Sequence, residues 1–308
     1  MTLTPAVTLT PSVAVELFGH DYDYAPVDFD FPLTTIRPFA PSNGAWCSTD
    51  PADDGLPPLD TDAQQWRPVP HDVNVFDGGG QPSVNSVVAG GPGVVAVGSV
   101  QDGEAAAVWT SPDGLSWQRV PHDEAVFGNG AMVSVVAGGP GFVAVGSEGP
   151  RAAVWTSTDG VAWQRVPHDE TVFSGNGRQW MTSLTVGGPG LVAVGRDFGS
   201  SAAAVWTSAD GFVWQRVPHD EAVFGNSSMR SVVAGGPGLV AVGVDEARGA
   251  AGVWTSTSNL SWQRLPHEEA LLGGDGNQWM ESVTVGGPGL VAIGGDSGRR
   301  AAAVWPSP

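Results

Sequence analysis

The stretch VWTSTDGVAWQRVPHDE, residues 154–170, decides the fold, because similar copies of it recur along the chain. The copies occupy residues 108–124, 205–221 and 253–269, and a fragment, WRPVPHD, occupies residues 66–72. The tryptophan that begins each WQR segment or its counterpart recurs at intervals of 51, 46, 51 and 48 residues, at Trp66, Trp117, Trp163, Trp214 and Trp262. A period of about 50 residues that carries several short strands predicts a β-propeller or a related closed array.

Each repeat contains short runs of β-forming residues separated by glycine and proline turns. The copy at residues 182–217 predicts four strands, at Ser183–Val186, Leu191–Gly195, Ala202–Thr207 and Phe212–Val217. Turns such as GGPG at residues 187–190 suit sharp hairpins, because glycine adopts positive φ without steric penalty. We therefore expect an all-β protein whose repeat is a four-stranded antiparallel blade.

The number of blades follows from where the strands begin and end. The order of strands occurs five times, beginning at Ser86, Ser134, Ser183, Ser231 and Ser282. The last copy stops after its third strand, and the missing fourth strand has its counterpart at Gln65–Val69. These observations predict a five-bladed β-propeller whose ring is closed by an N-terminal strand, which leaves no open sheet edge.

Six blades are the alternative. The distance from the histidine of each repeat to the next GGPG turn alternates between 19 and 16 residues, which suits an even number of blades. Gly44–Ser48 (GAWCS) also resembles a third strand, and it could belong to a diverged blade built from residues 12–69. With five blades, residues 44–308 form the propeller and residues 1–43, which contain few glycine turns, form an extended N-terminal arm.

The turn within each repeat points to a known family. Ser157–Trp163 resembles the Asp-box, the hairpin signature of sialidase-like (BNR-repeat) propellers, although its spacing is one residue shorter. Further copies stand at Ser111–Trp117 and Ser208–Trp214, and a decayed copy stands at Ser256–Trp262. The resemblance implies a structural turn on the face away from the active site. In such a turn the aspartate, here Asp113, Asp159 or Asp210, accepts backbone N–H bonds while the tryptophan packs into the blade.

The residues that the family uses for catalysis are not evident in the repeats. Sialidases of this fold use a tyrosine nucleophile and three arginines, whereas the tyrosines of this chain, Tyr22 and Tyr24, both precede the repeats. Whether the chain is an enzyme stays open. A glycoside hydrolase would have to use rim carboxylates such as Asp197, Asp245 and Glu281, two of which would lie roughly 6.5–9.5 Å apart for inverting hydrolysis.

Other charged residues recur or gather in the repeats. A histidine precedes an acid in every copy, as in His168-Asp169, and we interpret these pairs as caps of the connections between blades, with five shallow binding sites as the alternative. Five arginines occur between the second and third strands, where they could bind a carboxylate or only increase solubility: Arg151, Arg196, Arg248, Arg299 and Arg300.

Composition excludes several partners. The chain has 308 residues and a formal net charge of −19, with 32 acidic residues and 13 arginines. Such a charge repels nucleic acid and anionic lipid. The single cysteine, Cys47, forms no intrachain disulfide, and no apolar run is long enough to span a membrane. The opening residues do not resemble a signal peptide, so extracellular location would require a preceding segment. No cofactor motif is present, although calcium stays open; oligomeric state and compartment are undetermined.

Function is best sought where the copies differ. Trp180 and Trp279 occur only in the two longer loops, and the residue before the first-strand serine changes from copy to copy. These differences fall on one predicted rim, and tryptophan beside amide groups suits a sugar ligand. We predict a non-enzymatic binding or interaction module for a glycan or a protein, with a purely structural propeller as a further alternative. The predicted ligand-binding residues are Arg178, Gln179, Trp180, Arg230, Asn277, Gln278, Trp279 and Glu281.

Overall fold

The fold was analysed in a computed structural model. It describes residues 68–77, 80–91, 93–188, 190–236, 238–257, 261–286 and 289–307. All of these belong to one compact unit, Arg67–Pro308. The predicted arm at residues 1–43, the segment Gly44–Ser48 and most of the predicted closing strand lie outside the described residues. Within the described residues, none of the helices is long and apolar enough to cross a membrane.

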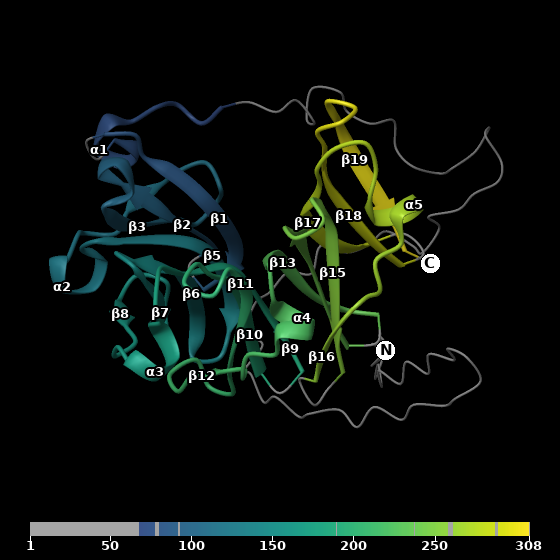
Figure 1. The fold of residues 1–308 in the computed structure, drawn as a ribbon. Helices are drawn as coiled ribbons and strands as arrows, with labels where there is room; N and C mark the ends of the chain where they lie inside the picture. The colour runs from purple at the N-terminus through teal and green to yellow at the C-terminus, as the bar shows by residue number, and fades with distance from the viewer. Residues whose placement is uncertain are drawn as a thin grey trace, which may run out of the picture. The chain divides into compact units, whose positions relative to one another are not determined.

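Five antiparallel sheets follow one another along the chain (Figure 1), and we call them blades 1 to 5. Strands within each blade pair in chain order, which confirms the predicted all-β class and the antiparallel blade. Blade 1 comprises β1 (Ser83–Gly90), β2 (Gly93–Val100), β3 (Ala105–Ser111) and β4 (Gln118–Arg119); blade 2 comprises β5 (Gly130–Gly138), β6 (Gly141–Glu148), β7 (Arg151–Ser157) and β8 (Trp163–Arg165). Blade 3 comprises β9 (Gln179–Gly187), β10 (Gly190–Asp197), β11 (Ala202–Ser208) and β12 (Gln215–Arg216); blade 4 comprises β13 (Ser227–Gly235), β14 (Gly238–Asp245), β15 (Ala250–Ser256) and β16 (Trp262–Arg264). Blade 5 has three strands in the described part of the chain: β17 (Gln278–Gly286), β18 (Gly289–Asp296) and β19 (Ala301–Pro306).

A short helix precedes each blade, and these helices were not predicted from the sequence. They are α1 (Val73–Phe76), α2 (Glu124–Phe127), α3 (Glu170–Phe173), α4 (Glu221–Phe224) and α5 (Glu269–Leu272), and a 3₁₀ turn, η1 (Gln101–Gly103), joins β2 to β3. An aspartate precedes four of the five helices and caps the N-terminus: the side chain of Asp169, for example, accepts a 2.8 Å bond from the Thr171 N–H. The predicted capping role is therefore confirmed for these aspartates.

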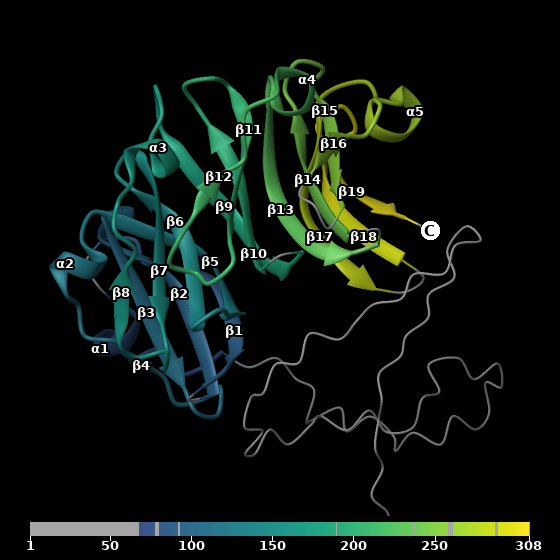
Figure 2. The same ribbon diagram turned by 90° about the horizontal axis from the view of Figure 1, so that it is seen from below.

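Successive blades lie face to face (Figure 2), and the apolar core lies between them. Val143, Val145 and Val154 of blade 2 form one buried cluster with Leu184 and Trp206 of blade 3, and equivalent clusters join the other neighbouring blades. Side chains of a strand point alternately to its two faces, so a second strand such as β10 of blade 3, with the run LVAV, is buried on both faces between two neighbouring blades. We call the face toward the preceding blade the leading face and the face toward the following blade the trailing face.

A β-bulge in each first strand explains an invariant feature of the repeat. In blade 3 the register shifts so that Val194 pairs with Ser183 and Gly195 with Met181, which leaves Thr182 without an opposite residue. A Cβ at Gly195 would lie 1.8 Å from the carbonyl oxygen of Trp180, so only glycine fits there. The same glycine opposes the bulge in the other blades, as Gly98, Gly146, Gly243 and Gly294.

Serine side chains connect each blade to the next. The Oγ of Ser134 accepts a 3.2 Å bond from the Leu184 N–H of blade 3, and the Oγ of Ser183 accepts a 3.1 Å bond from the Val232 N–H of blade 4. Ser86 and Ser231 form the same bond to blades 2 and 5. These bonds cross the inter-blade cores and fix the stagger of successive first strands.

The turn that resembles the Asp-box has the predicted internal bonds. Asp159 Oδ1 accepts the N–H groups of Val161 (2.8 Å) and Ala162 (2.7 Å), and the Trp163 indole donates to the Gly160 carbonyl at 2.9 Å. Gly160 has a φ of 80°, a conformation that glycine adopts readily. Because these bonds hold Phe212 and Val213 in the equivalent turn of blade 3, strand β12 is shorter than predicted.

The faces at the two ends of the series are the exception to this packing. Val84 and Val87 on the leading face of blade 1, and Ile293 and Val304 on the trailing face of blade 5, are exposed. Of the predicted closing strand Gln65–Val69, the described residues Pro68 and Val69 are not in a strand.

Candidate functional site

One end of each blade carries the predicted rim. In blade 3, Gln179 at the start of β9 pairs with Asp197 at the end of β10, and the Phe198 N–H donates to the Arg178 carbonyl at 2.9 Å. The residues that vary between copies therefore lie together, next to the loop between the second and third strands. The backbone hydrogen bonds between β9 and the end of β10 hold the side chains of residues 178–180 and 196–198 on a rigid base.

Two exposed aromatic rings occupy the rim of blade 3. Trp180 is 39% exposed and Phe198 is 42% exposed, and their ring centroids lie 5.7 Å apart with the planes at 90°. The Arg178 guanidinium lies 4.8 Å from the centroid of Trp180, and that of Arg196 lies 4.6 Å from the centroid of Phe198. We call these four residues the blade-3 cluster. Edge-to-face contact and two cation–π contacts hold the rings in place while leaving aromatic surface open.

An open hollow of about 430 Å³ adjoins this cluster, and Arg178 lines it. Its other lining residues come from the β6–β7 turn and the start of β7 in blade 2, from α3, and from the segment between α3 and β9: Pro150, Arg151, Glu170, Ser174, Gly175, Asn176 and Gly177. Arg151 Nη2 lies 3.5 Å from Glu170 Oε1. The hollow thus carries the charged side chains of Arg151, Glu170 and Arg178 among glycine and proline, and it reaches from blade 2 to the blade-3 cluster.

Blade 5 lacks the partners that surround Trp180. Since Gln278 pairs with Asp296 as Gln179 pairs with Asp197, Asn277 takes the place of Arg178. Gly295 likewise takes the place of Arg196, and a Cβ there would lie 2.3 Å from the Trp279 ring. The indole of Trp279 therefore lies against the backbone at Gly295 and is half-buried. The two predicted tryptophans have different surroundings.

Two of the three predicted amide side chains, those of Gln179 and Gln278, lie beneath the rim. Gln179 is fully buried and Gln278 is 3% exposed, because their side chains turn inward beside Asp197 and Asp296. Only Asn277 of the three predicted amide side chains is exposed. The sequence analysis also missed Phe198, although it interrupts the repeat and follows Asp197 in the loop that faces Trp180.

Arg230 and Glu281, the predicted opposite charges, form an ion pair with each other. Each occupies the bulge position of its first strand, so the pair links blade 4 to blade 5. Neutral residues do the same elsewhere: Asn85 Nδ2 donates to the Met132 carbonyl at 2.8 Å, and Thr182 Oγ1 donates to the Met229 carbonyl at 2.9 Å. The variable position thus contributes to contacts between blades as well as to the rim.

The carboxylates that a hydrolase would use are all engaged by arginine. Arg216 contacts Asp197 at 2.6 Å, Arg248 and Arg264 each contact Asp245 at 2.6 Å, and Glu281 pairs as described above. Burial raises the pKa of Asp197, but hydrogen bonds from Arg216 and Gln179 outweigh it and lower the pKa to about 2. A general acid requires a raised pKa, and every resolved shift among the described acids is downward.

The recurring histidines bind side chains rather than the backbone. The Nε2 atom of each of three histidines lies close to the Oε2 atom of the glutamate two residues later: His122–Glu124 at 3.0 Å, His219–Glu221 at 3.0 Å and His267–Glu269 at 2.9 Å. In four connections the aspartate directly after the histidine caps the backbone, whereas a capping role for the histidines themselves stays a prediction. Among the described residues, no three His, Cys, Asp or Glu side chains lie together as a metal site.

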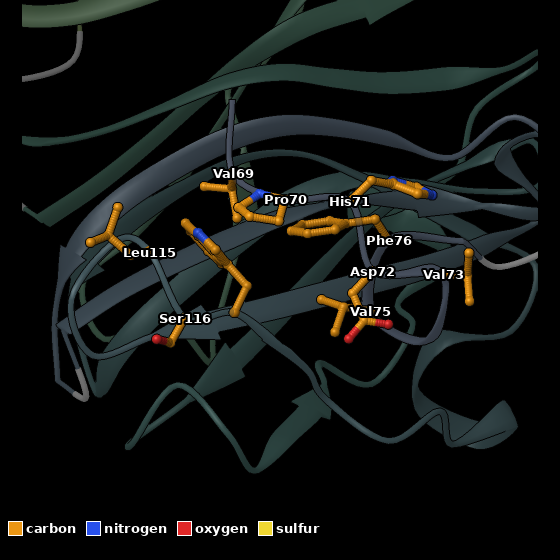
Figure 3. A pocket seen from close by; sticks show the side chains of 10 residues that line it. Val69, Pro70, His71, Asp72, Val73, Val75, Phe76, Leu115 and Ser116 are labelled. Atoms are coloured by element: carbon orange, nitrogen blue, oxygen red, sulfur yellow. The ribbon is translucent and has the colours of Figure 1, made fainter. Parts of the chain in front are cut away.

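A larger hollow of about 540 Å³ lies on the leading face of blade 1 (Figure 3). It is lined by the connection that contains α1 and by the β3–β4 turn: Val69, Pro70, His71, Asp72, Val73, Val75, Phe76, Leu115, Ser116 and Trp117. Trp117 is half-buried, whereas its counterparts Trp163 and Trp214 are 8% and 5% exposed against the preceding blade. The hollow therefore occupies a packing surface of the repeat, and its mainly apolar lining suits a neighbouring blade better than a reacting substrate.

Neither a family model nor the sequence of a curated protein matches this chain. Solved structures with a similar course of the chain include a protein from Lactobacillus plantarum (11% identity, TM-score 0.47, 72% of this chain and 70% of that one). Others are the GH43 endo-arabinanase from Bacillus licheniformis (12%, 0.37, 74% and 95%) and virginiamycin B lyase from Staphylococcus aureus (10%, 0.37, 76% and 87%). Identities and TM-scores this low transfer no activity to this chain.

Proposed function

We propose that this protein is a non-enzymatic β-propeller binding module that takes a glycan on the rim of its blades. The observation that carries the proposal is the exposed pair Trp180, in β9, and Phe198, directly after β10, beside an open hollow that carries charged side chains. A sugar ring has apolar C–H faces and a polar edge. An aromatic surface with hydrogen-bonding groups beside it is complementary to both.

The half-buried Trp279, with exposed Asn277 beside it, supports a second and weaker contact on blade 5. Arg230 and Glu281 lie on the same rim but satisfy each other, so we assign them to orientation of the rim rather than to the main contact. Gln179 and Gln278 support the rim from below. The blade-3 cluster and Trp279 are therefore the side chains whose removal tests the proposal.

The test is a glycan array probed with the wild-type protein and with Trp180→Ala. We expect the signal of every bound glycan to fall at least tenfold for Trp180→Ala, and to fall less for Trp279→Ala. Phe212→Ala is the matched control, because Phe212 is similarly exposed (43%) but lies in the turn at the opposite end of blade 3. Binding that survives Trp180→Ala, or no binding to any glycan, contradicts the proposal and leaves a structural propeller.

The alternative function is glycoside hydrolysis by rim carboxylates. Asp197, Asp245 and Glu281 each pair with arginine, and the pKa of Asp197 is lowered rather than raised, which favours binding over hydrolysis. Release of reducing sugar from a bound glycan, abolished by Asp197→Asn, would reverse this preference.

For the propeller itself we propose five blades closed into a ring, with Gln65–Val69 as the fourth strand of blade 5. The exposed end faces support closure because they carry matching groups. Ser282 Oγ would accept a bond from the Val87 N–H, as Ser231 Oγ does from the Val283 N–H one blade earlier. Protection of the Val87 amide from hydrogen exchange tests closure; exchange as fast as in an exposed loop contradicts it.

A further inference from the structure

Most arginines on the rim already have a carboxylate of the protein beside them. Arg151 contacts Glu170, Arg196 contacts Glu246 through a 2.6 Å Nη2–Oε2 bond, and Arg248 and Arg299 contact the aspartates three residues before them. Arg178 and Arg300 are different: neither forms an ion pair with a described residue. Arg178 shares its hollow with Glu170, but the carboxylate of Glu170 contacts Arg151 instead.

Arg178 is also the one that stands beside a candidate ligand surface. It is exposed, its guanidinium lies 4.8 Å from the centroid of Trp180, and it lines the hollow of about 430 Å³ next to that ring. The neighbouring Arg196 is held by Glu246, so Arg178 supplies the free positive charge of the cluster. Arg300, by contrast, has no ring contact in the described structure.

We propose that the blade-3 cluster binds a glycan that carries a carboxylate, with the sugar ring against Trp180 and Phe198 and the carboxylate on Arg178. This rests on the proposed glycan binding and names its ligand class. A guanidinium offers two parallel N–H donors that match the two oxygens of a carboxylate. Since the overall negative charge repels an anionic ligand at long range, the attraction has to come from this local contact.

Blade 5 provides the internal contrast. The residue at the position of Arg178 is Asn277, which is neutral, and no second ring accompanies Trp279. The carboxylate-binding site therefore occurs once among the described blades and is not repeated with the sequence. We expect one acidic saccharide per chain.

The experiment uses an array that carries uronic acids, their methyl esters, the corresponding neutral hexoses and sulfated hexoses, followed by titration of the strongest acid and its ester. We expect the acid to bind at least tenfold more tightly than its ester. Arg178→Gln should reduce affinity for the acid to that for the ester, while affinity for the ester changes less than twofold. Arg300→Gln is the matched control and should change neither. The preference for the acid should shrink in 0.5 M salt, because exposed charges are then screened over about 4 Å.

The outcomes separate this inference from the proposed function. Equal binding of acid and ester, preference for the sulfated sugars, or equal losses for both ligands in Arg178→Gln would overturn the carboxylate site while glycan binding through Trp180 stands. If the wild-type protein binds no glycan, or if Trp180→Ala leaves glycan binding unchanged, both the carboxylate site and the proposed function are overturned. Circular dichroism of Arg178→Gln verifies the fold, which an exposed side chain without a hydrogen bond of its own should not alter.

Discussion

The faces between neighbouring blades and the faces at the two ends of the series carry the same kinds of residue at the same repeat positions, but differ in burial. On trailing faces, Val194 of blade 3 is fully buried, whereas Ile293, its counterpart in blade 5, is 51% exposed. On leading faces, Met229 of blade 4 is fully buried, whereas Val84 of blade 1 is 54% exposed. A blade therefore does not bury its own apolar residues.

The difference teaches where the stability of the chain arises. Two pairs of side chains occupy equivalent places in their sheets, Val194 with Val205 and Ile293 with Val304, and each pair is shielded from water only if another blade covers it. Apolar area buried between blades is the main stabilising contribution, at about 25 cal/mol per Å². The apolar side chains on the two end faces are still exposed, and ring closure would bury them against each other.

The largest expected effect is Val194→Asp, which should lower the free energy of unfolding by about 4 kcal/mol or more, because a charge would enter a closed core. Ile293→Asp makes the same change on the end face. If the ring closes, its effect should exceed about 2 kcal/mol; a loss below about 0.5 kcal/mol means that the face stays open and contradicts closure. Val213→Asp, at an exposed turn, is the control, and chemical denaturation is the measurement.

Next in size is Asp197→Asn, which leaves the half-buried Arg216 without its carboxylate and should cost about 2 kcal/mol at pH 7. The folded pKa of Asp197 is about 2, below its ordinary value of 3.8, so its contribution is complete above about pH 4 and disappears as pH falls through about 2. The two proteins should therefore converge in stability at low pH.

The matching change in blade 5 is Asp296→Asn. Among the described arginines, Asp296 pairs only with the exposed Arg299, at 3.6 Å, and no fourth-strand arginine lies beside it, so its loss should be smaller. Equal losses at the two positions would show that the fourth strand contributes nothing to this ion pair. Urea denaturation between pH 2 and pH 7 measures both variants.

A smaller effect is expected for the serines that connect successive blades. Ser183→Ala removes the acceptor of the Val232 N–H and should cost about 1 kcal/mol. Ser282→Ala should cost the same if blade 5 closes onto blade 1, and nothing if it does not. Ser200→Ala, an exposed loop serine, is the control for loss of a hydroxyl, and thermal denaturation distinguishes the three.

The smallest effect on stability is expected for Trp180→Ala, below about 1 kcal/mol, because the ring is well exposed and its contacts are all on the surface. Trp206→Ala, by contrast, should cost about 3 kcal/mol or more, since that indole is fully buried and donates to the Val172 carbonyl at 2.7 Å. A large destabilisation by Trp180→Ala would show that this ring holds the rim together instead of presenting a surface.

The repeat predicted the blades well because its signals are local. Alternating Val and Ala runs, GGPG turns and the turn aspartates all act within one hairpin, and the structure has these strands and turns at nearly the predicted positions. The one-turn helices were missed because four residues give too short a pattern. Their aspartate cap, immediately before an acidic residue as in Asp169-Glu170, was the available signal.

The candidate site was predicted only in part. Trp180 and Arg178 stood out because they interrupt the repeat, and they do lie on the exposed rim. The burial of Gln179 and the contact between Trp180 and Phe198 depend on the register of β9 with β10, where a bulge shifts the pairing by one residue. A shift of one residue moves side chains to the opposite face, so the sequence alone could not assign them.

By itself, then, the sequence determined the unit of this protein: a four-stranded antiparallel blade, its turns, and the positions at which copies differ. Only the tertiary structure decided which of those positions are buried, which charges neutralise one another, and which guanidinium stays free beside an aromatic ring. The physical reason is range. Hydrogen bonds of a hairpin act between residues close in the chain, whereas burial, and ion pairs such as Arg196–Glu246 and Arg230–Glu281, depend on the neighbouring blade, about 50 residues away.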